Sequence, residues 1–269
     1  GQVDKAEAIT RRVLEASQRV LGPNHEITTE CLSNLGALLC ERGELDEAET
    51  IIRCAVKRTE KLFRSGDIWD IRPGKHAEKK AALAKLLVLM ANLAALLEKS
   101  QQYEESADLL RRVFEYRAQG SLASPETLAA QKNWGLMLHK CGKVKEAEDV
   151  IRRLLKICET TFGPDDFNTV DALQTLGMMF YNQNNQFDEA AAAYESVLEV
   201  SERTFGPTHE NTLMSIRNLG MMYLTKGTQE KAESTLRRSL ESHEQGLGLD
   251  NPFTLSSAYN LARTLQDRG

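Results

Sequence analysis

Apolar side chains recur every three or four residues along most of the chain, which is the spacing of helices with one buried face. Leu32, Leu35 and Leu39 show this pattern, with Gly36 on the same stripe. The 269 residues include only 6 prolines and 17 glycines. The tracts between them are rich in Ala, Leu, Glu, Gln, Lys and Arg, which favour helices. We therefore predict an all-α protein.

The helical pattern repeats with a period of about 42 residues. A large residue followed by a small one marks each repeat, and a second small residue lies about twelve positions further on. Small residues at that offset, one on each of two antiparallel helices, let the backbones approach closely, so each repeat is predicted to be a helical hairpin. The pairs are Leu35-Gly36, Leu93-Ala94, Trp134-Gly135, Leu176-Gly177, Leu219-Gly220 and Leu261-Ala262.

The period organises the chain as a single array of repeats. Residues 1–21 are predicted to be the second helix of a first unit, and residues 248–269 the first helix of a last unit. Complete units are predicted at about 22–63, 80–120, 121–162, 163–205 and 206–247, with an insertion at 64–79. Gly1 and Gly269 both take the turn position of Gly43. We expect a piece of a longer array, because a free solenoid normally ends in polar capping helices.

The segments that open the repeats resemble a known family. LGPNHEITTECLSNLG and FGPTHENTLMSIRNLG, at residues 21–36 and 205–220, carry a G-P-x-H-x-x-T linker before the large-small pair. This linker, the period and the small residues resemble the tetratricopeptide repeat of the kinesin light chain-like subclass, although the third unit lacks the G-P start. The resemblance implies a right-handed superhelical solenoid of antiparallel helix pairs with a concave groove.

Helical spacing places one face of each predicted first helix in this groove. An asparagine recurs on that face in five of the six helices, with Thr175 in the sixth. An amide carries both a donor and an acceptor, which suits it to hold the peptide units of an extended chain. The resemblance implies the same role, unless each asparagine bonds to a neighbouring repeat or caps a carbonyl. The five are Asn34, Asn92, Asn133, Asn218 and Asn260.

Other side chains on this face indicate which chemical groups a partner would need in order to bind. Leu136, Met178, Met214 and Met221 predict an adaptable apolar pocket for one anchor side chain, unless they fill the core. Cations also outnumber acids in the middle of the face, which favours a partner with acidic residues, unless the lysines are only solvated. These cations are Lys99, Lys132, Lys140, Arg217 and Arg263, against Asp171.

These positions together form the predicted peptide-binding set. Its members are Asn92, Lys132, Asn133, Leu136, Lys140, Gln174, Thr175, Met178, Met214, Arg217, Asn218, Met221, Tyr259, Asn260 and Arg263. Asn34 and Trp69 are candidate accessory contacts. Trp69 lies in the insertion, before a helix predicted from Lys75 to Glu98. It either forms an interaction spot, folds into the groove or packs on that helix, and we favour the last interpretation.

Composition narrows the classes of partner. With 34 basic and 39 acidic residues the net charge is −5, which disfavours nucleic acid. No apolar stretch approaches the roughly 20 residues that cross a bilayer, and the first residues lack the apolar core of a signal peptide. We expect a cytoplasmic protein without a membrane partner. Five cysteines without a CxxC pair predict neither disulfides nor a zinc site.

No catalytic motif is found in the sequence. P-loop, G-x-S-x-G and G-x-G-x-x-G segments are absent, and HEIT and HENT lack the second histidine of a zinc site. We expect no enzyme activity, cofactor or metal. The predicted function is a protein-protein interaction scaffold that binds a peptide segment of a partner in the concave groove. One alternative is a structural, autoinhibitory or oligomerisation module that packs on other domains of a parent signalling protein, such as a NACHT or NB-ARC type receptor. Another is a docking region of an enzyme whose active site lies elsewhere.

Overall fold

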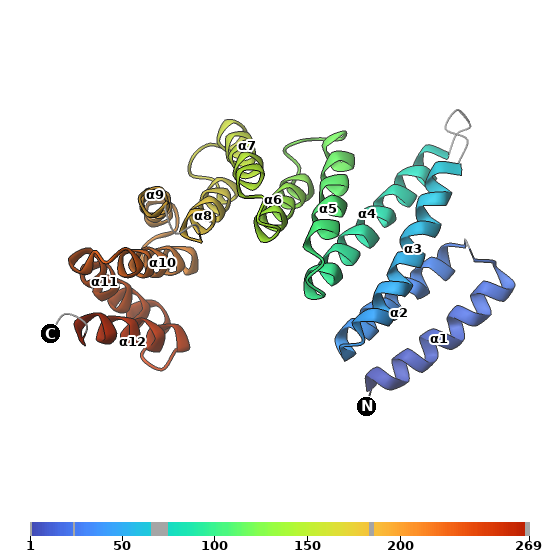
Figure 1. Cartoon of the computed structure of the whole chain (residues 1–269), viewed down its shortest axis with the longest axis horizontal. Helices are drawn as coiled ribbons and strands as arrows, with labels where there is room; N and C mark the ends of the chain where they lie inside the picture. Colours follow the sequence, from blue (N-terminus) through green and yellow to red (C-terminus); the bar gives the residue numbers. More distant parts are fainter. Residues whose placement is uncertain (1, 24, 66–74, 183–185, 267–269) are drawn as a thin grey trace. The chain divides into compact units, whose positions relative to one another are not determined.

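The computed structural model describes residues 2–23, 25–65, 75–182 and 186–266, and these form twelve α-helices and no strand (Figure 1). This confirms the predicted all-α class. The first six helices are α1 (Gln2–Val20), α2 (Glu26–Arg42), α3 (Leu45–Ser65), α4 (Lys75–Lys99), α5 (Tyr103–Ala118) and α6 (Pro125–Lys140). The next six are α7 (Val144–Phe162), α8 (Phe167–Tyr181), α9 (Phe187–Phe205), α10 (Glu210–Lys226), α11 (Gln229–Leu247) and α12 (Pro252–Gln266).

The helices belong to two compact units, residues 1–120 with 140–142, and residues 121–139 with 143–269. In the first unit, α1 to α5 pack on one another in chain order. In the second, α7 to α12 do the same, and α6 packs on α7 at Gly135. Packing between chain neighbours is the arrangement expected of helical repeats. The repeat boundaries derived from the sequence stay a prediction.

The linker that precedes a repeat has the same structure at four places. A glycine with a φ between 84° and 94° follows the previous helix, and its carbonyl accepts a hydrogen bond of 2.7–2.9 Å from a buried threonine six residues later. A positive φ of this size favours glycine. The side chains of His25, Asp166 and His209 then cap α2, α8 and α10 by accepting an N–H two residues on. The bonded pairs are Gly22 with Thr28, Gly163 with Thr169, Gly206 with Thr212, and Gly248 with Thr254.

The glycines of the large-small pairs lie where the two helices of a hairpin meet. A Cβ added to Gly135 would lie 2.5 Å from Ile151 of α7, and one added to Gly220 would lie 2.6 Å from Leu236 of α11. A side chain at either position would force the facing Ile151 or Leu236 to shift, so glycine allows the closest packing there. The second small residues are fully buried as well, and they include Ala48, Ala147, Ala190 and Ala232. The predicted close approach of the helix backbones is therefore confirmed.

Helix α4 has 25 residues and is the longest of the described helices, and its segment Lys80–Lys99 is strongly apolar. It begins at Lys75, as predicted, while most of the insertion at 64–79, including Trp69, lies outside the described residues. By length and composition alone, Lys80–Lys99 could cross a membrane, with a mean hydropathy of 1.8. The sequence-based expectation that no stretch was long enough is wrong, because the average stays apolar despite Lys85. Buried side chains such as Met90 and Leu97 explain this apolarity, since α4 packs on both α3 and α5.

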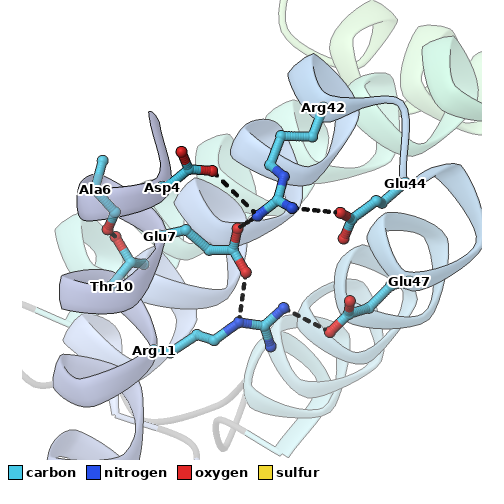
Figure 2. Close-up of polar contacts among 8 residues, drawn as sticks. All are labelled: Asp4, Ala6, Glu7, Thr10, Arg11, Arg42, Glu44 and Glu47. Atoms are coloured by element: carbon cyan, nitrogen blue, oxygen red, sulfur yellow. Dashed lines mark hydrogen bonds and ion pairs between the residues drawn. The ribbon is translucent and has the colours of Figure 1, made fainter. Parts of the chain in front are cut away.

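Ion pairs join α1 to α2 and α3 in the first unit (Figure 2). The nearly buried Glu7 pairs with Arg11 at 2.8 Å and also with Arg42. Arg11 further contacts Glu47 at 2.8 Å, and Arg42 contacts Glu44 at 2.9 Å. The hydrogen bond from Arg11, together with the Arg42 charge, holds the pKa of Glu7 below its usual value. The packing of α1 therefore depends on charge as well as on apolar contact.

Candidate functional site

The first helices of successive repeats in the second unit contact one another through residues of the predicted face. Lys132 of α6 pairs with Asp171 of α8, with 2.6 Å between Nζ and Oδ2. Gln174 of α8 donates to the hydroxyl of Ser215 on α10 at 2.9 Å, and α10 contacts α12. The predicted face therefore runs across neighbouring helices rather than along one of them.

Helices α6, α8, α9 and α10 line a cavity of about 620 Å³. This volume falls in the range of ligand pockets, roughly 300–1,000 Å³. Part of the lining belongs to the predicted peptide-binding set, namely Lys132, Leu136, Gln174, Thr175, Met178, Met214, Asn218 and Met221. The rest of the lining is Asp171, Tyr181, Asn182 and Tyr194, which were not in that set.

Adjacent methionines divide between the cavity and the core. Met178 lines the cavity and is 39% exposed, whereas Met179 is fully buried. Met221 lines the cavity, whereas Met222 is fully buried. Successive side chains on a helix point about 100° apart, so one member of each pair faces outward. The alternative that the methionines of the predicted face fill the core is therefore wrong for the cavity residues.

Several polar groups of the cavity already have partners. Lys132 and Asp171 pair with each other, so the charged residues in its lining cancel. Thr175 is buried, and its hydroxyl donates to the carbonyl of Asp171 at 2.8 Å. Asn218 differs, because its side chain makes no hydrogen bond within the described parts of the chain. The cavity thus presents apolar walls together with the amide of Asn218, whose donor and acceptor are both unused.

The recurring asparagines do not hold the repeats together. Asn34, Asn92 and Asn133 are exposed, and Asn218 and Asn260 are half-buried. Considering only residues that the structure describes, none of these five side chains bonds to another protein group. This is contrary to the alternative in which they bind neighbouring repeats or cap carbonyls. Of the five, Asn218 lines the cavity, so the structure does not gather all the amides at one site.

The remaining predicted residues lie outside this cavity. Lys140 pairs with Glu98, and this pair and the one in the cavity reduce the positive surplus that the sequence indicated. Arg217 lines a second, smaller cavity. Tyr259 and Arg263 are exposed on α12. Trp69 cannot be placed, because it lies outside the described residues.

Sequence reasoning missed two tyrosines of the lining. Tyr181 follows Met178 by three positions, so the same-face spacing was a signal for it. Tyr194 comes from α9 and reaches Gly177, where one of its ring carbons lies 3.2 Å from the place of a Cβ. No pattern within a single helix identifies such a contact between helices. Burial raises the pKa of Tyr194 to about 12, so its hydroxyl stays protonated at neutral pH.

The described residues contain neither a metal-binding cluster nor an activated thiol. No group of three or more His, Cys, Asp or Glu side chains there could hold a metal ion. None of the five cysteines, all of which lie in described segments, forms a disulfide. Burial raises the pKa of Cys158 to about 11 and also raises that of Cys40. A thiol with a raised pKa stays protonated at neutral pH and is a poor nucleophile.

Helices packed in chain order, with small residues where each hairpin meets, define a helical repeat protein. The sequence model described as Tetratricopeptide repeat matches residues 1–61, 126–201 and 179–245. The chain belongs to the tetratricopeptide repeat family, which confirms the resemblance seen in the sequence. No curated protein sequence matches the chain.

Solved structures share this fold. BtubC (BKLC) from P. vanneervenii is similar over 94% of this chain and 95% of its own, with a TM-score of 0.65 and 18% identity. A putative kinesin light chain of nearly identical repeats from Podosopora anserina is similar over 68% of this chain and 87% of its own, with a TM-score of 0.59 and 24% identity. A Rap protein complexed with Competence and Sporulation Factor is similar over 90% of this chain and 65% of its own, at a TM-score of 0.53 and 13% identity. These similarities concern the fold alone, and the kinesin light chain-like subclass is consistent with them.

Proposed function

We propose that this chain is a non-enzymatic scaffold that binds a peptide segment of a partner protein along α6, α8 and α10. The observation that supports it is the cavity of about 620 Å³, with outward-facing methionines in its lining. Methionine is flexible and polarizable, so it adapts to the shape of a partner side chain. An apolar anchor buried in such a pocket contributes much of the binding energy at many interfaces.

The proposed contact to the partner backbone is the amide of Asn218. An extended peptide offers an N–H and a C=O at each residue, and one amide side chain can bond to both kinds of group. Asn133 is exposed on α6 and extends the same set of amides. A precedent for ligand binding on this fold is the Rap protein complexed with Competence and Sporulation Factor.

Charge has a smaller part in this proposal than the sequence indicated. Lys132 is paired with Asp171, so an acidic partner residue that enters the large cavity meets no free cation from that pair. The partner is therefore expected to bind through an apolar anchor, with any acidic residues lying outside this cavity.

Selection of a random peptide library on the purified chain tests the proposal. We expect enriched peptides whose affinity falls about tenfold or more in Met178→Asp and in Asn218→Ala. Both positions are outside the core, so helicity and melting should hardly change. Val20→Asp is the control, since Val20 is 72% exposed on α1 and far from the cavity in sequence. The proposal is wrong if no peptide is enriched, or if binding is indifferent to both substitutions.

A structural or oligomerisation role within a larger signalling protein is the second candidate, and α12 favours it. Leu255 and Tyr259 of this helix are 58% and 66% exposed. Exposed apolar groups of this size often contact another protein surface when they cluster. Sedimentation over a concentration series separates the two candidates. A monomer at all concentrations supports the peptide-binding proposal, whereas a dimer that Leu255→Glu abolishes supports the alternative.

We also propose a cytoplasmic location and a protein partner rather than nucleic acid. Five cysteines that form no disulfide suit a reducing compartment, and the net charge of −5 is unfavourable for a phosphate backbone. Fractionation of cells that express the tagged protein should recover it with cytoplasmic markers. Recovery in washed membranes or in the medium would contradict this location.

A further inference from the structure

A second cavity lies next to the first in the same unit. It has a volume of about 280 Å³ and is lined by α10, α11, the linker residue Asn251 and Phe253 near the start of α12. Met214 lines both cavities. One extended segment can therefore contact the two cavities in succession.

The walls of the second cavity are mainly apolar. Leu213 is 2% exposed, Leu247 is 40% exposed and Phe253 is 52% exposed. His243 is also buried, and its Nδ1 donates to the carbonyl of Ser239 at 2.6 Å. Burial lowers the pKa of His243, so this ring is neutral at pH 7 and adds no charge. The space suits an apolar side chain.

Two charged residues of α10 complete the lining. Glu210 stands in the first turn and Arg217 lies seven residues later, so their backbones are about 10 Å apart along the helix. The guanidinium of Arg217 lies 5.4 Å from the ring centroid of Phe253, which holds it at the cavity. Within the described residues, neither Glu210 nor Arg217 has an ion-pair partner. The apolar interior therefore has a free carboxylate toward one end and a free guanidinium toward the other.

We propose that this second cavity is a specificity subsite for an extended peptide segment with an apolar anchor between an acidic residue, which binds Arg217, and a basic residue, which binds Glu210. The inference rests on the proposed function. It adds the charge pattern of the part of the segment that lies beyond the large cavity. An extended chain advances about 3.3 Å per residue and alternate side chains share a face, so the two partner charges are expected about four positions apart, with the anchor midway. The opposite charges fix the direction and register of the segment, since charge complementarity mainly provides specificity.

A uniformly acidic segment fits this subsite less well. Its carboxylates would bind Arg217 but would also lie near the unpaired carboxylate of Glu210. Like charges brought together at an interface oppose binding. The subsite therefore distinguishes a mixed-charge segment from one that carries acids alone.

The test selects a random peptide library on the whole chain, in the wild type and in two charge-reversed variants, Glu210→Lys and Arg217→Glu. Glu199→Lys is the matched control, because Glu199 is exposed on α9 and lines neither cavity. We expect wild type and control to enrich the same motif, an acid and a base about four positions apart around an apolar residue. We expect Glu210→Lys to lose the basic position and Arg217→Glu to lose the acidic one.

Binding measurements with single synthetic peptides complete the test. A wild-type motif peptide should bind each charge-reversed variant about tenfold more weakly. A peptide with its two charges exchanged should bind wild type equally weakly and should recover affinity for the double variant. The exchanged peptide on wild type keeps the test decisive even if a protein variant fails to fold.

The outcomes separate the subsite from the proposed function. In one outcome, binding depends on Met178 and Asn218 but does not change in Glu210→Lys or Arg217→Glu, and the exchanged peptide binds as well as the motif peptide. This outcome overturns the subsite and leaves the proposed function standing. A selection that yields no peptide dependent on either cavity overturns both.

Discussion

At the scale of single residues, each repeat uses one side-chain type for one physical task. Glycine takes the positive φ at Gly206, and the buried Thr212 hydroxyl bonds to that carbonyl at 2.8 Å. A second glycine, Gly220, leaves room for Leu236 of the paired helix. Met221 faces the cavity, and its neighbour Met222 faces the core. Residues that pack in the core and residues that line the cavity therefore alternate along the same helix.

Filling the space above Gly220 should destabilise the protein. A Cβ there would lie 2.6 Å and 2.9 Å from two carbons of the fully buried Leu236. We expect Gly220→Val to lower the free energy of unfolding by about 1–3 kcal/mol, the usual cost of overpacking. Urea denaturation measures it, and Ala192→Val on the exposed side of α9 should change it by less than about 0.5 kcal/mol. Equal losses in the two variants would show that the contact at Gly220 is unimportant.

Two histidines with lowered pKa values should make stability fall in mild acid. Burial lowers the pKa of His243 and of His139 below the usual 6.5. As the pH falls below that value, the unfolded chain takes up protons before the folded chain does, so folding becomes less favourable. We expect the melting temperature to fall between about pH 7.5 and pH 5.5, and to fall less in His243→Gln. Parallel melting curves across this range would rule out a contribution from His243.

At the scale of helices, regular spacing could be predicted and contacts between helices could not. Leu136, Met178 and Met214 were placed on one face because the helical period fixes where each side chain points. The inward position of Tyr194 depends on the gap at Gly177 of another helix. The pairing of Lys132 with Asp171 depends on the direction in which two flexible side chains turn. The sequence pattern of a single helix therefore predicts neither contact.

The second cavity was missed for a related reason. It forms where α10 and α11 meet the linker before α12, and Phe253 reaches Arg217 only through the path of that linker. A repeat period identifies equivalent positions but does not reveal which of them enclose space. Arg217 was therefore assigned to the binding face without the neighbours that define its pocket.

The ion pairs of α1 should matter most at low ionic strength. We expect Glu7→Gln to speed amide hydrogen exchange in α1 several-fold at low salt, because it removes the carboxylate shared by Arg11 and Arg42. The difference should shrink in about 1 M salt, which screens charges beyond roughly 3 Å. Glu15→Gln is the control, since Glu15 is exposed on the same helix. Identical exchange in the two variants would mean that apolar packing alone holds α1.

The same carboxylate should also contribute to acid unfolding. The pKa of Glu7 lies below its usual 4.5, so its stabilising effect is complete above that value and is lost as the pH falls through the folded-state pKa. This window is more acidic than that of the histidines. Stability measured against pH should therefore fall in two separate ranges.

At the scale of the whole molecule, the chain is a tetratricopeptide repeat protein of two compact units, and both cavities belong to the second unit. A role in protein interaction accords with this family and with the exposed side chains of successive first helices. The central claim is that a partner segment enters the cavities from α6 to α12 without disturbing the core beneath them.

Methionine methyl NMR tests this claim most directly, because the seven methionines report on both places. Met178, Met214 and Met221 line the large cavity, whereas Met90, Met137, Met179 and Met222 are buried. On addition of a selected peptide, we expect the methyl signals of the three cavity methionines to shift and those of the four buried ones to stay in place. A bound peptide that leaves the three cavity signals unchanged would contradict the account.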